Sequence, residues 1–216
     1  MILFRHMTVI LTCVFQTTAS DSALVSIVAA RSLYTSRHRD AKLEDLVIYT
    51  TTQTHSLGVK AGLVLGLQCR SLDVRAEDQY ALRGDTLRAA LEEDIGNGKH
   101  PFVLGEVISP TSLPETADIM LSSCHSRDHV FRCHRSSGGD RRTWSVCDTA
   151  SYPAGFLTIS LAKQYPSLWI HVDAAWAGVA LSCPEYREVA QLDQINKIAD
   201  SFCTNLHKAR ILIQDS

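Results

Sequence analysis

Apolar residues recur along the chain in two alternating patterns, one with helical spacing and one with the short continuous run of a buried strand. Helical spacing is found in three segments, at residues 22–34, 56–67 and 86–95. Short apolar runs, each predicting a strand, are found at residues 46–51, 69–74 and 101–107. Because the two patterns alternate, the first half of the chain predicts an α/β domain with a mainly parallel sheet.

Polar residues mark where these helices are expected to begin. Ser20 or Asp21 is suited to cap the first helix, Ser56 starts the second and Asp85 is suited to cap the third. Such side chains accept hydrogen bonds from the free amides of a first turn. The third helix is expected to end at residues 96–98, which read Gly-Asn-Gly.

The alternation fails after the third strand. Residues 106–153 are rich in Ser, His, Arg and Cys and show no sustained period, so this segment is predicted to be an aperiodic insertion. Order resumes with a predicted helix at 155–167, a strand at 168–178 that runs into a turn of small residues, a short polar helix near 185–197 and a last strand at 199–204.

Composition narrows the class of protein. The chain has 216 residues, of which 45% are hydrophobic and 20% charged, with a formal net charge of −2. That charge argues against the basic surface on which nucleic-acid binding depends. Apart from the N-terminal segment, no run approaches the roughly 18 apolar residues of a membrane span. A protein that acts on small molecules, with neither nucleic acid nor membrane as partner, is expected.

The cysteines favour a reducing compartment. There are seven of them, without a Cys-x-x-Cys pair, so neither a disulfide framework nor a zinc ribbon is predicted. Cys124-His125 and Cys133-His134 come nearest to a metal cluster, but their separation is not a usual ligand spacing. No metal site is predicted.

The N-terminus also imitates a secretory signal. Arg5 precedes an apolar run at residues 7–15, and Thr18-Ala19-Ser20 forms a small-residue step. A secreted protein therefore stays open as an alternative at this point.

Three residues able to carry chemistry follow predicted strands. Asp173 falls at the carboxyl end of a strand, where open α/β sheets bind ligands. Lys208 follows the last strand, and His55 lies between a strand and a helix start. A buried lysine can have a lowered pKa that makes its neutral amine available. Taken singly, residues at such positions more often have no catalytic role: Asp173 would be a structural carboxylate, Lys208 a solvated lysine and His55 a capping or surface histidine.

Taken together, these residues stand in segments that resemble a known family. HVDAAWAG (171–178), CPEYR (183–187) and ADSFCTNLHK (199–208) resemble the pyridoxal-phosphate-dependent group II decarboxylases, and among them the aromatic-L-amino-acid decarboxylases. The resemblance extends back through ALRGDTLRAALEEDI (81–95), LVIYTTTQTHSLGVKAGL (46–63) and VFQTTASDSALVSIVAARS (14–32).

The resemblance implies a fold and a division of the chain. The fold is the large domain of the fold type I transferase-like enzymes that use pyridoxal 5'-phosphate (PLP), a mainly parallel sheet flanked by helices. Residues 13–216 would form an incomplete copy of this PLP-binding domain, interrupted by the insertion, and residues 1–12 an atypical N-terminus.

The resemblance also implies roles for individual residues. Lys208 would form the Schiff base with the cofactor aldehyde. Asp173 would pair with the pyridine nitrogen and keep it protonated, while Ala175 and His55 would contact the ring from its two sides. The other implied cofactor-binding positions are Thr18, Ala19 and Ser20, which match the family's phosphate cup, and Asn205 and His207 beside the lysine. Cleavage of a signal at the cup would remove or expose it, which weakens the secretory reading.

The implied activity is decarboxylation of an aromatic L-amino acid, a carboxy-lyase reaction, by a cytoplasmic homodimer. The amine of the small-molecule substrate would displace Lys208, and the protonated ring would take up the electrons released with carbon dioxide. Glutamate and cysteine-sulfinate decarboxylases and aldehyde synthases share the same lysine chemistry.

Several positions depart from the family's pattern. Leu206 replaces a proline, Ala209 a tryptophan and Thr12-Cys13 a run of glycines, and residues 105–110 replace a Gly-Thr-Thr-Ser loop. Family members are also much longer, so a fragment or degenerate copy is expected. Two alternatives therefore stay open: an inactive pseudoenzyme that retains the PLP-binding core, and a small secreted protein whose resemblance is a relic.

Overall fold

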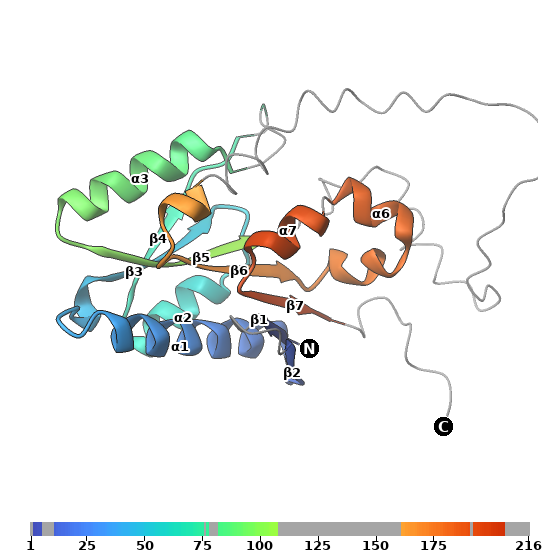
Figure 1. The fold of residues 1–216 in the computed structure, drawn as a ribbon, viewed down its shortest axis with the longest axis horizontal. Helices are drawn as coiled ribbons and strands as arrows, with labels where there is room; N and C mark the ends of the chain where they lie inside the picture. The colour runs from blue at the N-terminus through green and yellow to red at the C-terminus, as the bar shows by residue number, and fades with distance from the viewer. Residues whose placement is uncertain are drawn as a thin grey trace, which may run out of the picture.

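A seven-stranded sheet forms the centre of the structure, a computed structural model that describes residues 2–5, 11–75, 77, 82–107, 161–190 and 192–205 (Figure 1). The strands are β1 Ile2–Arg5, β2 Leu11–Val14, β3 Leu46–Thr51, β4 Gln68–Leu72, β5 His100–Val107, β6 Trp169–Ala174 and β7 Ser201–Thr204. Their order in the sheet is β2-β1-β7-β6-β5-β3-β4. The five strands from β7 to β4 are mutually parallel, and β1 pairs antiparallel with both β7 and β2.

Helices cover both faces of this sheet. The α-helices are α1 Ala19–Arg37, α2 Leu57–Leu65, α3 Gly84–Gly96, α6 Pro184–Val189 and α7 Leu192–Ile198, with 3-10 turns at η1 Leu43–Asp45 and η5 Ala177–Ser182. Residues 161–164 are also helical. Figure 1 shows α1 and α2 below the sheet and α3 and α7 above it. The predicted α/β class, with helices flanking a mainly parallel sheet, is confirmed.

The core follows from these layers. On one face, Ile27 and Ala30 of α1 pack with Ile48, Phe102 and the partly buried Trp169 of the sheet. On the other face, two clusters form, one beneath α3 and one beneath η5, α6 and α7. A bulge in β5 relative to β3 lets Phe102 and Leu104 face opposite layers although they are two residues apart.

Most predicted elements are confirmed. The strand at 46–51 is β3, and the strands predicted at 69–74 and 101–107 are β4 and β5. The two strands predicted near the C-terminus are β6 and β7. Of the helix predicted at 155–167, only residues 161–167 lie in the described part of the chain, and 161–164 are helical. The strands β1 and β2 were not predicted.

The predicted caps of two helices were wrong. The N-cap of α1 is Thr18, so Ser20 and Asp21 lie inside its first turn. The N-cap of α3 is Arg83, which makes no side-chain capping bond, and Asp85 lies in the first turn. Ser56 is at the N-cap of α2, but its side chain makes no capping hydrogen bond.

The polar helix predicted near 185–197 is two helices in the structure, α6, which ends at Val189, and α7, which begins at Leu192. Pro184 starts α6, as expected for a residue that lacks an amide hydrogen. The division places the partly buried Leu192 and Ile195 of α7 against the cluster beneath it.

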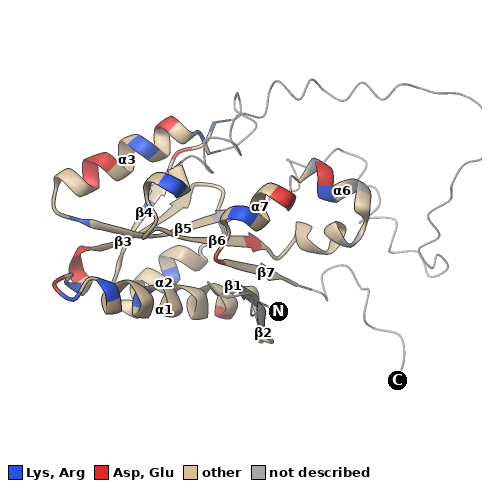
Figure 2. Ribbon diagram, in the orientation of Figure 1, with Lys and Arg blue, Asp and Glu red and all other residues tan. Residues whose placement is uncertain are grey.

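Charged residues of both signs are spread over the outer faces of the helices (Figure 2). Some of them anchor α3 to the sheet. Arg70 of β4 forms ion pairs with Glu93 at 2.6 Å and with Asp94 at 2.9 Å. The buried Tyr49 hydroxyl donates a hydrogen bond to Asp94 at 2.5 Å, and its burial raises the tyrosine pKa.

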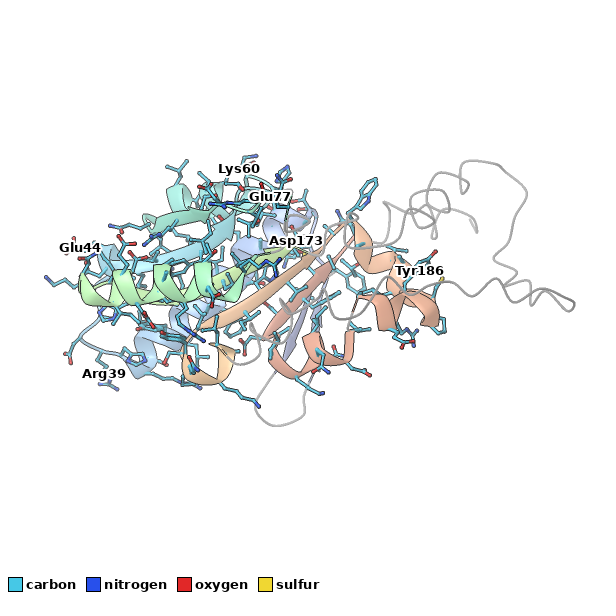
Figure 3. All side chains as sticks on the ribbon, turned by 90° about the horizontal axis from the view of Figure 1, so that it is seen from above. Arg39, Glu44, Lys60, Glu77, Asp173 and Tyr186 are labelled. Carbon is cyan, nitrogen blue, oxygen red and sulfur yellow. The ribbon has the colours of Figure 1, made fainter. Side chains whose placement is uncertain are left out.

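Parallel strands end at a common edge, and this edge positions the candidate site. The carboxyl ends of β3, β6 and β7 meet there, and α1 begins there because it runs antiparallel to the strands that it covers. Figure 3 shows Arg39 and Glu44, from the loop after α1, at the end of the structure away from Asp173. Within the described residues no helix is long and apolar enough to cross a bilayer.

Candidate cofactor site

The first turn of α1 carries the predicted phosphate cup. Thr18 caps the helix by accepting a hydrogen bond at 3.1 Å from the amide of Asp21. The Asp21 carboxylate accepts hydrogen bonds from the hydroxyls of Thr18, at 2.8 Å, and of Thr17, and these bonds lower the Asp21 pKa. The two hydroxyl protons are thus directed to Asp21. The donors left for an anion at this turn include the amides of Ala19 and Ser20, which have no acceptor within the helix.

Asp173 lies at the carboxyl end of β6, and its side chain is buried. Its Oδ1 atom accepts two hydrogen bonds, one from the amide of Ala175 at 2.9 Å and one from the thiol of Cys203 at 3.3 Å. Its Oδ2 atom accepts no hydrogen bond from the described residues. One oxygen is therefore fixed by the protein and the other is left for a ligand.

The cup and Asp173 are brought together by a small apolar cluster. Ala175 and Cys203 form its buried centre, and Val14 and Ala19 pack against them. The first turn of α1 therefore lies beside the ends of β6 and β7. Amide donors and a carboxylate acceptor at neighbouring points suit a ligand that carries both an anionic group and a protonated nitrogen.

His171, two residues before Asp173 in β6, is a second buried polar side chain. His171 is 1% exposed, and its Nδ1 atom lies 2.8 Å from the hydroxyl oxygen of Ser201, which also accepts the indole N–H of Trp169 at 2.8 Å. The Nε2 atom has no partner in the described residues. Burial lowers the pKa of His171 to about 4, against an opposing effect of the Asp173 charge. The imidazole is neutral near pH 7.

Other predicted positions lie apart from this cluster or outside the described residues. His55 lies in the loop between β3 and α2, at the same edge of the sheet, and its side chain is exposed. That loop is closed by Thr54, whose hydroxyl accepts the amide of Thr51 at 3.0 Å. Asn205 directly follows β7 and is half-buried.

Lys208 and His207 lie outside the described residues, as do the Cys124-His125 and Cys133-His134 pairs and most of the predicted insertion at 106–153. Their predicted roles stay predictions. Within the described part of the chain there is no group of three or more metal-ligating side chains.

Two residues of the site were not predicted from the sequence. They are Cys203, which donates a hydrogen bond to Asp173, and Ser201, whose hydroxyl contacts His171. Cys203 faces Asp173 and Ser201 faces His171 in the register of β6 and β7. In both His171-Val172-Asp173 and Ser201-Phe202-Cys203 the first and third side chains point to the same face of the strand, and this alternation was the available signal. The signal could be used only with the knowledge that β6 and β7 are neighbours in the sheet.

Most of the chain is similar in sequence to known proteins. The chain is 34% identical over 205 residues to an aromatic-L-amino-acid decarboxylase of Manduca sexta, covering 90% of this chain and 32% of that protein. It is 32% identical over 198 residues to a phenylacetaldehyde synthase of Arabidopsis thaliana, with 90% and 32% coverage.

The fold is shared with a solved structure. The crystal structure of Oryza sativa TDC with PLP superposes with a TM-score of 0.66 at 28% identity, over 94% of this chain and 35% of that one. The chain spans about a third of the length of these relatives.

The family profile described as the pyridoxal-dependent decarboxylase conserved domain matches residues 6–115 and 156–215. The match covers most of the chain and includes the cup, Asp173 and Lys208. The resemblance predicted from sequence is confirmed, and the chain belongs to the pyridoxal-dependent decarboxylase family.

Proposed function

We propose that the chain is the core of a PLP-dependent carboxy-lyase that acts on an aromatic L-amino acid and uses Lys208 as its covalent anchor. The observation that carries the proposal is the meeting of Asp173 with the first turn of α1 at the carboxyl edge of the sheet. Family membership and the names of relatives, which include an aromatic-L-amino-acid decarboxylase, support the reaction and the substrate class.

The described residues fit the two polar ends of PLP. A pyridine N–H would find an acceptor in Asp173 Oδ2, which has no partner within the described residues. A phosphate would find the amides of Ala19 and Ser20 and the positive end of the helix dipole. The proposed cofactor-binding residues are Thr18, Ala19, Ser20, His55, Asp173, Ala175, Asn205, His207 and Lys208.

Each residue would have a definable task. When bound, the cofactor supplies a conjugated ring that takes up the electron pair of the bond broken as carbon dioxide leaves. Asp173 would hold a proton on the ring nitrogen, and its burial makes that charge effective, since interactions between charges strengthen as water is excluded. Lys208 would supply the amine that anchors the cofactor and then gives way to the substrate amine.

A second function, cofactor binding without turnover, is favoured by one observation. Leu206 and Ala209 flank the His-Lys step, where the family resemblance implies proline and tryptophan. A homodimeric assembly and a cytoplasmic location, both implied by the resemblance, belong to the first proposal.

Covalent trapping tests the cofactor site. The purified chain is incubated with PLP, reduced with borohydride, digested and mapped by mass spectrometry. We expect the pyridoxyl group on Lys208, and the variant Lys208→Ala should show no specific label. Label distributed over surface lysines in both proteins would overturn the proposal.

Turnover separates the two functions. Release of labelled carbon dioxide from carboxyl-labelled tyrosine, tryptophan or dopa, dependent on Lys208, would establish the carboxy-lyase. Labelling of Lys208 without carbon dioxide release from any of the three would favour the binding-only core.

A further inference from the structure

Asp173 has an unusual second partner in Cys203. The two residues stand opposite each other in the register of β6 and β7, and the thiol donates to Oδ1 at 3.3 Å. The same oxygen accepts the amide of Ala175 at 2.9 Å. Both donors therefore converge on one oxygen of the carboxylate.

The environment keeps this thiol a hydrogen-bond donor. Cys203 is 1% exposed, and Ala175, Val14 and Ala19 pack around it. Burial, together with the neighbouring charge of Asp173, raises the Cys203 pKa. Since only a protonated thiol can donate, the bond to Asp173 persists across the neutral pH range.

Two donors on one oxygen restrict how the carboxylate turns. The terminal torsion of an aspartate has a broad preference, and a single hydrogen bond from the backbone amide restrains it only loosely, so the carboxylate could still turn about its Cβ–Cγ bond. The thiol comes from a neighbouring strand and supplies a second fixed point. Oδ2 is then held in one direction, without a partner in the described residues.

We infer that Cys203 is a positioning residue that orients the Asp173 carboxylate so that Oδ2 meets the pyridine nitrogen of the bound cofactor. This inference rests on the proposed function. Cys203 touches no reacting atom in this role, and it acts through Asp173 alone. Its contribution is to cofactor affinity and to the proton on the ring nitrogen.

Three variants separate positioning from packing. Cys203→Ser retains a donor, Cys203→Val fills the space without one, and Cys203→Ala removes both donor and volume. Cys69→Ala is the matched control, because Cys69 is another free cysteine on a strand; it is partly buried and lies on the edge strand β4, away from β6 and β7.

The test measures three quantities on the 216-residue chain: the dissociation constant of PLP by equilibrium titration, the 15N chemical shift of PLP labelled at the ring nitrogen, and urea unfolding without cofactor. We expect Cys203→Val and Cys203→Ala to weaken PLP binding about three- to tenfold, as for loss of one hydrogen bond. In both variants the nitrogen shift should move towards that of the unprotonated ring. Cys203→Ser should restore both readouts, and Cys69→Ala should leave them unchanged.

Two results would overturn the inference alone. One is a Cys203→Val chain that binds PLP at Lys208 with wild-type affinity and an unchanged nitrogen shift. The other is a Cys203→Ser chain as impaired in both readouts as Cys203→Val, with unfolding losses of the same order, which would assign Cys203 to packing. Failure of the wild-type chain to be trapped at Lys208 would instead remove the proposed function, and the inference with it.

Discussion

At the scale of single residues, burial of His171 makes the stability of the fold depend on pH. Its pKa is lowered to about 4 in the folded chain, mainly by burial, whereas an exposed histidine titrates near 6.5. Between these values the unfolded chain binds more protons than the folded one, so stability is lost as the pH falls from 6.5 towards 4. The loss reaches about 3 kcal/mol.

The variant His171→Asn tests this dependence. Its amide occupies the place of Nδ1 beside Ser201 but does not titrate. Urea unfolding from pH 7.5 to 5 should show a falling free energy for the wild type and a shallower fall for the variant. Measurements at pH 7.5 supply the baseline, since His171 is neutral there in both states. Parallel curves for the two proteins would contradict the assignment.

At the scale of elements, the end of β7 is fitted tightly against the turn that follows β6. A Cβ atom at Gly178 would lie 2.5 Å from Oγ1 and 2.8 Å from Cβ of Thr204, and 3.1 Å from Cβ of Ala174. No side chain fits there unless η5 or β7 moves. Since β7 leads into the Asn205 to Lys208 step, this contact fixes where that step begins.

We therefore expect Gly178→Ala to destabilise the chain by about 1–3 kcal/mol, the usual cost of overpacking. Gly96→Ala at the end of α3 is the matched control, because nothing lies within 4 Å of its added Cβ. Urea unfolding of the two variants gives the comparison. Equal free energies of unfolding would show that the turn absorbs the extra methyl group without cost.

Helices and strands were the features that the sequence predicted best. Continuous apolar runs identified β3 and β6 because these strands are buried on both faces. The residues at which the helices begin were predicted less accurately. Thr17, Thr18, Ser20 and Asp21 are all competent capping residues, and only the direction in which the chain enters α1 selects Thr18. The spacing of apolar residues along the sequence does not show from which direction the chain enters the helix.

At the scale of the whole molecule, the site combines residues distant in sequence. Asp173 and Lys208 were predicted as site residues through the family resemblance, which depends on motifs read in order along the chain. The contact of Cys203 with Asp173, and the cluster with Ala19, depend on strand order and register. Short segments carry no information about which strand lies beside which, so these contacts needed the fold.

The assembled edge predicts that PLP stabilises the whole chain, and more than pyridoxal does. PLP at one hundred times its dissociation constant should add about 2.7 kcal/mol, a rise in melting temperature of about 5 °C or more for a chain of this size. Pyridoxal lacks the phosphate that the amides of Ala19 and Ser20 would receive, so at equal concentration its shift should be smaller.

Ala19→Pro assigns that difference to the helix start. The proline removes one amide at the first position of α1, where its ring is tolerated, and the extended backbone of Thr18 suits a following proline. Thermal unfolding with each ligand should show a smaller gap between PLP and pyridoxal in the variant than in the wild type. Equal shifts from the two ligands in the wild-type chain would contradict phosphate binding at α1, while leaving the Asp173 side of the site to be judged by the Cys203 variants.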